Sequence, residues 1–134
     1  MDADRRRDDR AGRFAYDGLD RLLHERSRLG ILASLSSSPD GRSFGELKSM
    51  CSLTDGNLSR HLQTLSEAGL VTLRKVAGDR RTICRLTVEG RARFEAYVDE
   101  LERVLRDAQA IRREATRDAP SIERGQVPPG WLPA

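Results

Sequence analysis

The polar side chains between Thr54 and Thr64 are the part of this sequence best suited to recognition chemistry. Asn forms a pair of hydrogen bonds with the edge of adenine, and Arg does the same with guanine. Asn57 and Arg60 place these two groups within one helical turn of each other, so this segment has the chemistry to read base edges. The remaining candidate contacts to nucleic acid in the segment are Thr54, Asp55, Gly56, Ser59, His61, Gln63 and Thr64.

Gly56 is an unusual member of this set, because glycine costs about 1 kcal/mol relative to alanine inside a helix. Two explanations stay open from the sequence. The absence of a side chain either lets the backbone approach a DNA duplex or lets the helix pack closely on the helix before it.

A second group of candidate contacts, four basic residues and one threonine, follows shortly after this segment. These residues are Arg74, Lys75, Arg80, Arg81 and Thr82. Guanidinium and ammonium groups bind phosphates, which positions a protein on DNA without specifying sequence and makes binding dependent on salt. Asp79 lies in the same stretch, where we expect it to orient an arginine rather than to contact DNA.

The charge distribution supports a polyanionic partner. The chain of 134 residues has 24 basic and 21 acidic residues, a formal net charge of +3. Residues 42–88 alone hold eight basic and four acidic residues, so this stretch carries the whole surplus. A double-stranded nucleic acid would explain such a concentration of positive charge.

Other features of the composition exclude several classes of protein. No stretch approaches 18 consecutive apolar residues, which excludes a membrane-spanning helix. The charged N-terminal residues do not resemble a secretory signal, and two cysteines are too few for a disulfide scaffold. We therefore expect a soluble, cytoplasmic protein with no membrane partner.

The elements that must position the candidate residues follow from periodicity and capping. Leucines from Leu19 to Leu35 have helical spacing, with a possible break at 24–27. Ser43 and Glu46 form a capping box at the start of a second helix. Thr54 is the expected N-cap of a helix over 54–68, which Gly69 ends in a left-handed conformation. Two short helices joined by a tight turn predict a helix-turn-helix.

After Gly69 the apolar period changes from that of a helix to that of a strand. Residues 70–76 and 82–86 are both prone to form strands, and the short loop at 77–81 joins them as a hairpin. A basic hairpin directly behind a helix-turn-helix is typical of the wing of a winged helix.

Thr87 is then predicted to cap a long helix over 89–117, about 40 Å in length. Such a helix is longer than a domain of this size is wide, so we expect a second subunit to cover part of its apolar stripe. The predicted dimerisation residues are Phe94, Tyr97, Val98, Leu101, Val104, Leu105, Ala108 and Ile111. The same stripe is compatible with a small-molecule effector pocket at the dimer interface, although it has few polar residues to anchor a ligand.

These elements predict a mostly α-helical α+β fold, a winged helix-turn-helix followed by a long dimerisation helix. Residues 1–17 form a charged, flexible N-terminal arm in this interpretation, and residues 18–88 form the DNA-binding domain. Residues 89–117 form the dimerisation helix, and residues 118–134 form a disordered, Pro-rich tail.

The order of these elements and several motifs resemble the winged-helix transcriptional regulators of the MarR/ArsR-like group. The likeness is strongest to the small single-domain winged-helix DNA-binding family. It rests mainly on the runs LTDGNLSRHL at 53–62, LSEAGLV at 65–71 and LTVEGR at 86–91. Weaker blocks lie at 22–24, 28–32, 43–47 and 81–82, and the whole resemblance covers about two thirds of the chain. It implies a homodimeric DNA-binding repressor or activator without enzymatic activity.

Other functions find less support in the sequence. There is no glycine-rich phosphate loop, HExxH motif or plausible catalytic Ser or Cys, so we expect no enzyme and no cofactor. The cysteines and histidines lack metal-ligand spacing, so we expect no metal. Two alternatives stay open: a redox-responsive regulator that acts through Cys51, and a winged helix that binds protein rather than DNA. A redox role for Cys51 would require a lowered thiol pKa.

Overall fold

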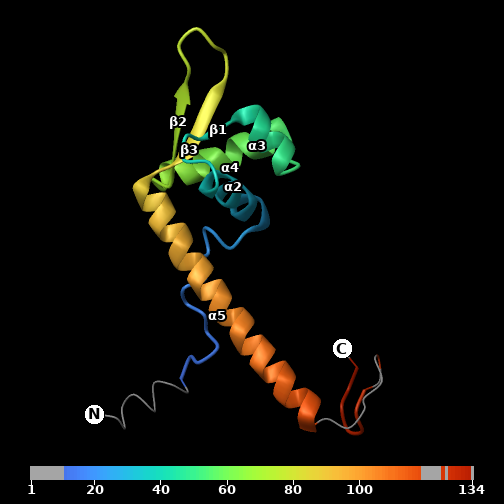
Figure 1. Ribbon diagram of the computed structural model, residues 1–134. Coiled ribbons are helices and arrows are strands. Elements are labelled where there is room, and N and C mark those ends of the chain that lie inside the picture. Colours follow the sequence, from blue (N-terminus) through green and yellow to red (C-terminus); the bar gives the residue numbers. More distant parts are fainter. Residues whose placement is uncertain (1–10, 119–124, 126, 134) are drawn as a thin grey trace, which may run out of the picture. The chain divides into compact units, whose positions relative to one another are not determined.

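The computed structural model describes residues 11–118, 125 and 127–133 of the chain (Figure 1). Most of the predicted N-terminal arm, residues 1–10, lies outside this part, as do residues 119–124, 126 and 134 of the predicted tail. The elements are α2 (Arg26–Ser36), β1 (Arg42–Ser43), α3 (Phe44–Met50), α4 (Asp55–Glu67), β2 (Val71–Lys75), β3 (Thr82–Leu86) and α5 (Val88–Asp118). This order confirms the predicted winged helix-turn-helix with a long C-terminal helix. Within the described residues, no helix has both the length and the apolar character needed to cross a membrane.

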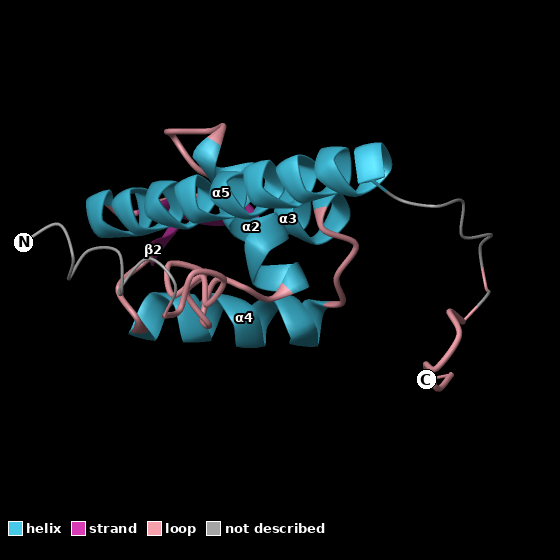
Figure 2. Ribbon diagram, turned by 90° about the horizontal axis from the view of Figure 1, so that it is seen from below, coloured by secondary structure: helices cyan, strands magenta, loops and turns pink. Residues whose placement is uncertain are grey.

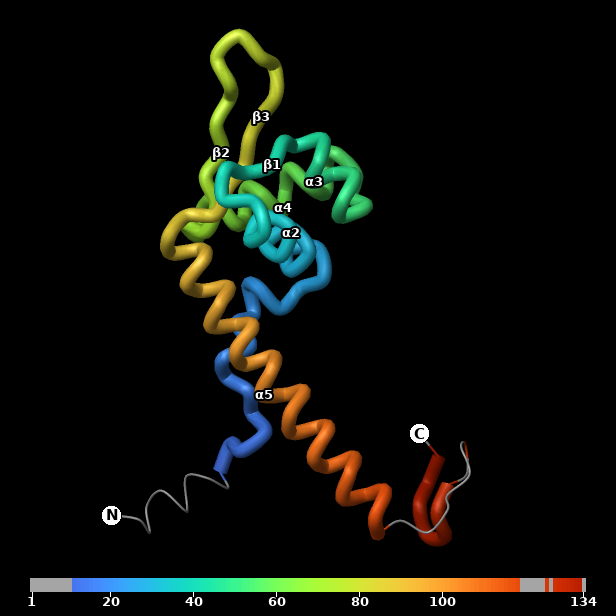
Figure 3. The backbone as a smooth tube through the Cα atoms, viewed as in Figure 1, coloured from blue at the N-terminus to red at the C-terminus, as the bar shows by residue number. Residues whose placement is uncertain are grey.

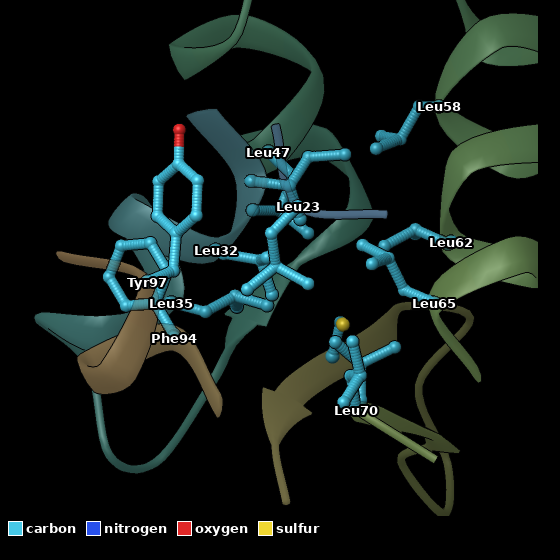
Figure 4. Close-up of a cluster of buried hydrophobic side chains, with 13 residues drawn as sticks. Leu23, Leu32, Leu35, Leu47, Leu58, Leu62, Leu65, Leu70, Phe94 and Tyr97 are labelled. Atoms are coloured by element: carbon cyan, nitrogen blue, oxygen red, sulfur yellow. The ribbon is translucent and has the colours of Figure 1, made fainter. Parts of the chain in front are cut away.

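The chain divides into two compact units, residues 1–101 and 102–134, and the core belongs to the first. Leucines of α2, α3 and α4 meet there with residues of the sheet and of α5 (Figure 4). Helix α2 lies between α4 and the N-terminal part of α5 (Figure 2). The buried set is Leu23, Ile31, Leu32, Leu35, Leu47, Leu58, Leu62, Leu65, Leu70, Val71, Cys84, Phe94 and Tyr97. Each large apolar side chain in it contributes roughly 1.5–3 kcal/mol through burial.

Local capping signals set the ends of α3 and α4 as the sequence predicts. The Ser43 side chain accepts a hydrogen bond from the backbone N–H of Glu46 at 3.1 Å, and the Glu46 carboxylate lies 3.5 Å from the Ser43 N–H. Thr54 caps α4 by accepting from the N–H of Asn57 at 3.2 Å. Gly69 has a φ of +78°, the left-handed conformation expected just after a helix.

The sheet has three antiparallel strands in the order β1-β3-β2. The hairpin matches the prediction closely, with Val71 opposite Leu86 and Lys75 opposite Thr82. Strand β1 is not predicted by the sequence. It pairs Arg42 with Cys84, and it begins directly after Gly41, whose φ is +96°. A Cβ at Gly41 would lie 2.6 Å from the carbonyl oxygen of Cys84, so this close approach requires glycine.

The prediction of helix from Leu19 is wrong for the residues before the break expected at 24–27, because the helix begins only at Arg26. Residues 16–24 form turns instead, in which Asp20 accepts a hydrogen bond from the N–H of Leu22 at 2.9 Å. Asp20 also forms an ion pair with Arg93 of α5 at 2.5 Å, and this hydrogen bond lowers the pKa of Asp20. Glu25 then caps α2 by accepting from two backbone N–H groups. The helical spacing of the first leucines therefore arises from turns that fold onto the core.

Helix α5 begins with the predicted Thr87 cap but differs from the prediction in the face that it exposes. Phe94 and Tyr97, expected in the dimerisation stripe, are buried in the core of their own subunit. The Tyr97 hydroxyl lies 2.7 Å from Nδ1 of His24. The rings of Phe94 and Tyr97 stack with their centroids 6.5 Å apart. Their apolar surface is therefore covered without a partner. Val98 and Leu101 are partly buried against the same core.

Replacement of Gly90 by alanine should destabilise the fold. A Cβ at this position would lie 2.0 Å from the carbonyl oxygen of Leu70, so α5 would have to move away from the hairpin. We expect Gly90→Ala to lower the free energy of unfolding by about 1–3 kcal/mol, measured by urea denaturation. Gly45→Ala is the matched control, since a Cβ there meets nothing within 4 Å. Equal stability of the two variants would contradict this packing argument.

Candidate nucleic-acid interface

Helix α4 presents a polar face because its apolar residues are used in the core. Leu58, Leu62 and Leu65 are buried, and the intervening positions point away from them. Of the candidate contacts in this segment, Thr54, Asp55, Gly56, Asn57, Ser59, Arg60 and Gln63 are exposed, while His61 and Thr64 are partly buried. Burial of the leucines thus brings most of the predicted recognition residues to one surface.

Asn57 and Arg60 form a linked pair on this surface. Nη2 of Arg60 donates a hydrogen bond to Oδ1 of Asn57 at 2.7 Å. The amide N–H groups of Asn57 and the other guanidinium N–H groups of Arg60 remain as donors. Each of these two side chains therefore orients the other.

The N-terminal end of α4 gains a cation that sequence reasoning missed. Nζ of Lys48, in α3, lies 2.9 Å from Oδ1 of Asp55. This ion pair offsets the negative charge of Asp55, which would otherwise repel phosphates. The signal in the sequence is weak, because nothing in it links a lysine in one short helix to the first residue of the next.

Gly56 lies in open space in this structure. A Cβ added there would meet no atom within 4 Å, so close packing on the preceding helix does not explain the glycine. Of the two explanations that the sequence leaves open, the structure therefore contradicts the packing one. The approach of a DNA duplex to the backbone at Gly56 stays a prediction.

Other candidate residues of α4 are engaged in contacts within the protein. The His61 side chain is only 15% exposed, and its Nδ1 lies 4.0 Å from the Glu25 carboxylate that caps α2. Gln63 donates to Glu67 at 3.1 Å, and the Thr64 hydroxyl donates to the carbonyl of Arg60 at 3.0 Å. His61 thus has little exposed surface with which to contact a partner. Gln63 is exposed and could contact a partner once its hydrogen bond to Glu67 is broken.

The hairpin carries the second group of candidates, and its loop is organised around Asp79. Nε of Arg81 donates to Oδ2 of Asp79 at 2.7 Å, and the hydrogen bonds from Arg81 lower the pKa of Asp79. Asp79 therefore orients an arginine, as expected. Arg74, Lys75 and Arg80 are exposed and form no ion pair with any residue that the structure describes, while Thr82 is partly buried.

The two thiols lack the environment of a reactive cysteine. Burial raises the pKa of Cys51, and it raises the pKa of Cys84 to about 12. A thiol with a raised pKa stays protonated at neutral pH, whereas redox-active cysteines have lowered values. The requirement for a redox role of Cys51 is therefore not met. Among the residues described, no three His, Cys, Asp or Glu side chains form a group that could hold a metal ion.

Comparison with known proteins shows a consistent likeness. The pattern of the family described as "Winged helix DNA-binding domain" matches residues 27–105. An uncharacterized protein of Methanocaldococcus jannaschii is 42% identical over 60 residues, which span 43% of this chain and 65% of that protein. The uncharacterized HTH-type transcriptional regulator YdgJ of Bacillus subtilis is 34% identical over 82 residues. That match spans 60% of this chain and 49%, about half, of YdgJ.

A solved structure agrees with the sequence matches. The transcriptional regulator homologue protein from Pyrococcus horikoshii OT3 superimposes with a TM-score of 0.62 and 31% sequence identity. The superposition covers 65% of this chain and 87% of that one. The match to the family pattern extends from α2 through the hairpin into α5, so it includes both groups of candidate residues. The chain belongs to the winged helix DNA-binding domain family.

Proposed function

We propose that this protein is a transcriptional regulator that binds double-stranded DNA sequence-specifically as a homodimer. The observation that carries the proposal is the exposed Asn57–Arg60 pair on α4, next in sequence to a hairpin with three cations that form no ion pair with a described residue. Helix α4 enters the major groove in this proposal. The hairpin β2–β3 lies along the phosphate backbone or in the adjacent minor groove.

Helix α4 has the chemistry that direct readout requires. The major groove admits a helix, and the residues near the N-terminal end of a recognition helix come closest to the base edges. Asn57 and Arg60 lie in the first two turns, where each would contribute about 1–3 kcal/mol of discrimination. Gly56 would let the backbone of the first turn approach the duplex, and Lys48 beside Asp55 would contact a phosphate.

The hairpin supplies affinity rather than specificity. Arg74, Lys75 and Arg80 have no carboxylate partner among the described residues to release before they bind phosphate. Each such contact releases counterions from the DNA, so binding weakens as the salt concentration rises. A winged helix that binds protein instead of DNA would have no need of these cations together with the polar face of α4, which is why we favour DNA.

The homodimer is inferred from the residues of α5 beyond Leu101. Leu105 and Ile111 are about half exposed, at 53% and 51%, and Ala108 lies between them on the same stripe. A partner helix would bury this surface, as in coiled-coil packing. Two recognition helices related by a two-fold axis would then bind half-sites about 34–36 Å apart. In this proposal residues 18–88 form the DNA-binding region and residues 89–117 the dimerisation helix.

The first test is binding of the full chain to duplexes of random sequence over a range of salt concentrations, followed by selection of the preferred site. We expect a steep loss of affinity with salt and an inverted-repeat site. Arg60→Ala should relax the preference at one position, whereas Arg80→Ala should weaken all sequences alike and reduce the salt slope by about 1. Arg21→Ala removes an exposed charge outside α4 and the hairpin, so it should leave both the base preference and the affinity unchanged. Absence of duplex binding at low salt would refute the proposal.

Gly56→Ala separates stability from binding. Since the added Cβ meets no atom of the protein, the variant should be more stable by about 0.5–1 kcal/mol in urea denaturation. The same methyl group should obstruct the approach of the backbone to DNA and lower the affinity for the selected site roughly tenfold or more. A gain in stability with unchanged affinity would show that no duplex approaches this position.

The dimer is tested by placing charges on the exposed stripe of α5. The double variant Leu105→Glu, Ile111→Glu should be monomeric in sedimentation equilibrium at concentrations where the unmodified chain is dimeric, because carboxylates would be buried against each other. Ala110→Glu adds a charge to the same helix on the face away from Leu105 and Ala108, and it should leave the dimer intact. A monomeric unmodified chain would contradict the homodimer.

A further inference from the structure

Strand β2 has an edge that no described segment covers. In the order β1-β3-β2, strand β3 has a neighbour on each side, whereas β2 pairs with β3 alone. Figure 3 shows β2 on the side of the hairpin away from β1. An uncovered strand edge presents a row of backbone donors and acceptors to which another extended chain can pair.

The pairing pattern identifies which backbone groups face outward. The Thr87 N–H donates to the carbonyl of Leu70 at 3.0 Å, and the Val76 N–H lies 3.4 Å from the carbonyl of Arg81. In an antiparallel pair, alternate residues direct both backbone groups to the neighbouring strand. Residues 70, 72, 74 and 76 therefore face β3. Leu73 and Lys75 direct their N–H and C=O groups to the open edge.

The face of the hairpin turned away from the core has a hollow across β2 and β3 that is rich in positive charge. It is lined by Thr72, Arg74, Ile83 and Arg85, together with Asp40. Arg74 and Arg85 are exposed, and neither forms an ion pair with a residue in the described part of the chain. One carboxylate against two guanidinium groups leaves this hollow suited to acidic side chains.

The face of the hairpin turned toward the core has a hollow that is partly apolar. Phe44, Leu62 and Leu73 line it, together with Thr82. Leu73 is 42% exposed, although it lies on the face of the hairpin that is turned toward the core. Glu67 is also in this lining but is held by Gln63. An apolar side chain would bury part of Leu73 here.

We propose that the open edge of β2 binds an extended, acidic peptide segment of a partner protein, which joins the sheet as a fourth strand. Side chains of an extended chain alternate between the two faces of a sheet. Acidic residues of the partner would then face Arg74 and Arg85, and apolar residues would face Leu73. Backbone hydrogen bonds supply affinity in this mode of recognition, and the alternate side chains supply specificity.

The chemistry of β2 and its surroundings favours an acidic peptide over two other partners, a second copy of β2 and duplex DNA. A second copy of β2 would bring Arg74 and Lys75 against their own equivalents, and like charges on adjacent strands are destabilising. Duplex DNA would satisfy the arginines, but it has no row of backbone amides to pair with Leu73 and Lys75 and no apolar side chain for the hollow near Leu62. An acidic peptide with apolar residues satisfies all three features, because it has carboxylates for the arginines, backbone amides for the strand edge and apolar side chains for the hollow.

The backbone pairing is tested with the full chain and a labelled seven-residue peptide of alternating Glu and Val, by fluorescence anisotropy without DNA. Leu73→Pro removes an outward N–H from an edge position where proline is tolerated, and it should weaken binding roughly tenfold. Leu73→Ala keeps that N–H and should weaken binding less. A peptide with N-methylated valines should also bind poorly to the unmodified chain, which tests the pairing even if the proline variant does not fold.

The charge pattern is tested with the double variant Arg74→Glu, Arg85→Glu. It should lose roughly tenfold or more in affinity for the Glu-Val peptide and should bind a Lys-Val peptide instead. No saturable binding of the Glu-Val peptide up to about 1 mM would overturn the proposal. Binding that is unchanged by both Leu73→Pro and N-methylation would overturn it too. If these variants weaken duplex binding but not peptide binding, the edge is a DNA contact and the proposal is wrong.

Discussion

Burial of the three leucines of α4 is the interaction on which the proposed interface depends. Leu58, Leu62 and Leu65 enter a core that also takes leucines from α2 and α3, so the rotation of α4 about its axis is set by apolar packing. The polar residues between these leucines therefore face outward. Recognition residues on α4 are therefore positioned by side chains that would never touch a ligand.

The junction between the hairpin and α5 has a similar role for the wing. The Thr87 hydroxyl lies 2.7 Å from the carbonyl of Gly69 and 3.2 Å from that of Leu70, and it accepts from the N–H of Gly90 at 2.9 Å. One side chain thus ties the end of the turn after α4 to the start of α5. The two ends of the hairpin are held together there, while its basic loop extends away from the core.

The distribution of ion pairs separates the charges that shape the protein from those that remain for partners. Asp20 with Arg93 joins the turns before α2 to α5, and Asp79 with Arg81 organises the hairpin loop. Lys48 with Asp55 joins the two helices of the helix-turn-helix. Arg74, Arg80 and Arg85 lie on the hairpin and make no such pair with a described residue. Their charges are therefore available to the two proposed partners, duplex DNA and an acidic peptide, which are both negatively charged.

Features that depend on residues close together in the chain could be predicted from residue type and spacing alone. The Ser43 capping box, the Thr54 cap, the left-handed Gly69 and the hairpin loop each involve groups within a few positions, so their geometry follows from residue type. The order of elements and the polar face of α4 followed from periodicity. The tertiary structure brings together groups that are distant in the chain. It paired β1 with β3, turned His61 toward Glu25 and buried Phe94 and Tyr97 in their own subunit, because such contacts depend on packing that periodicity does not encode.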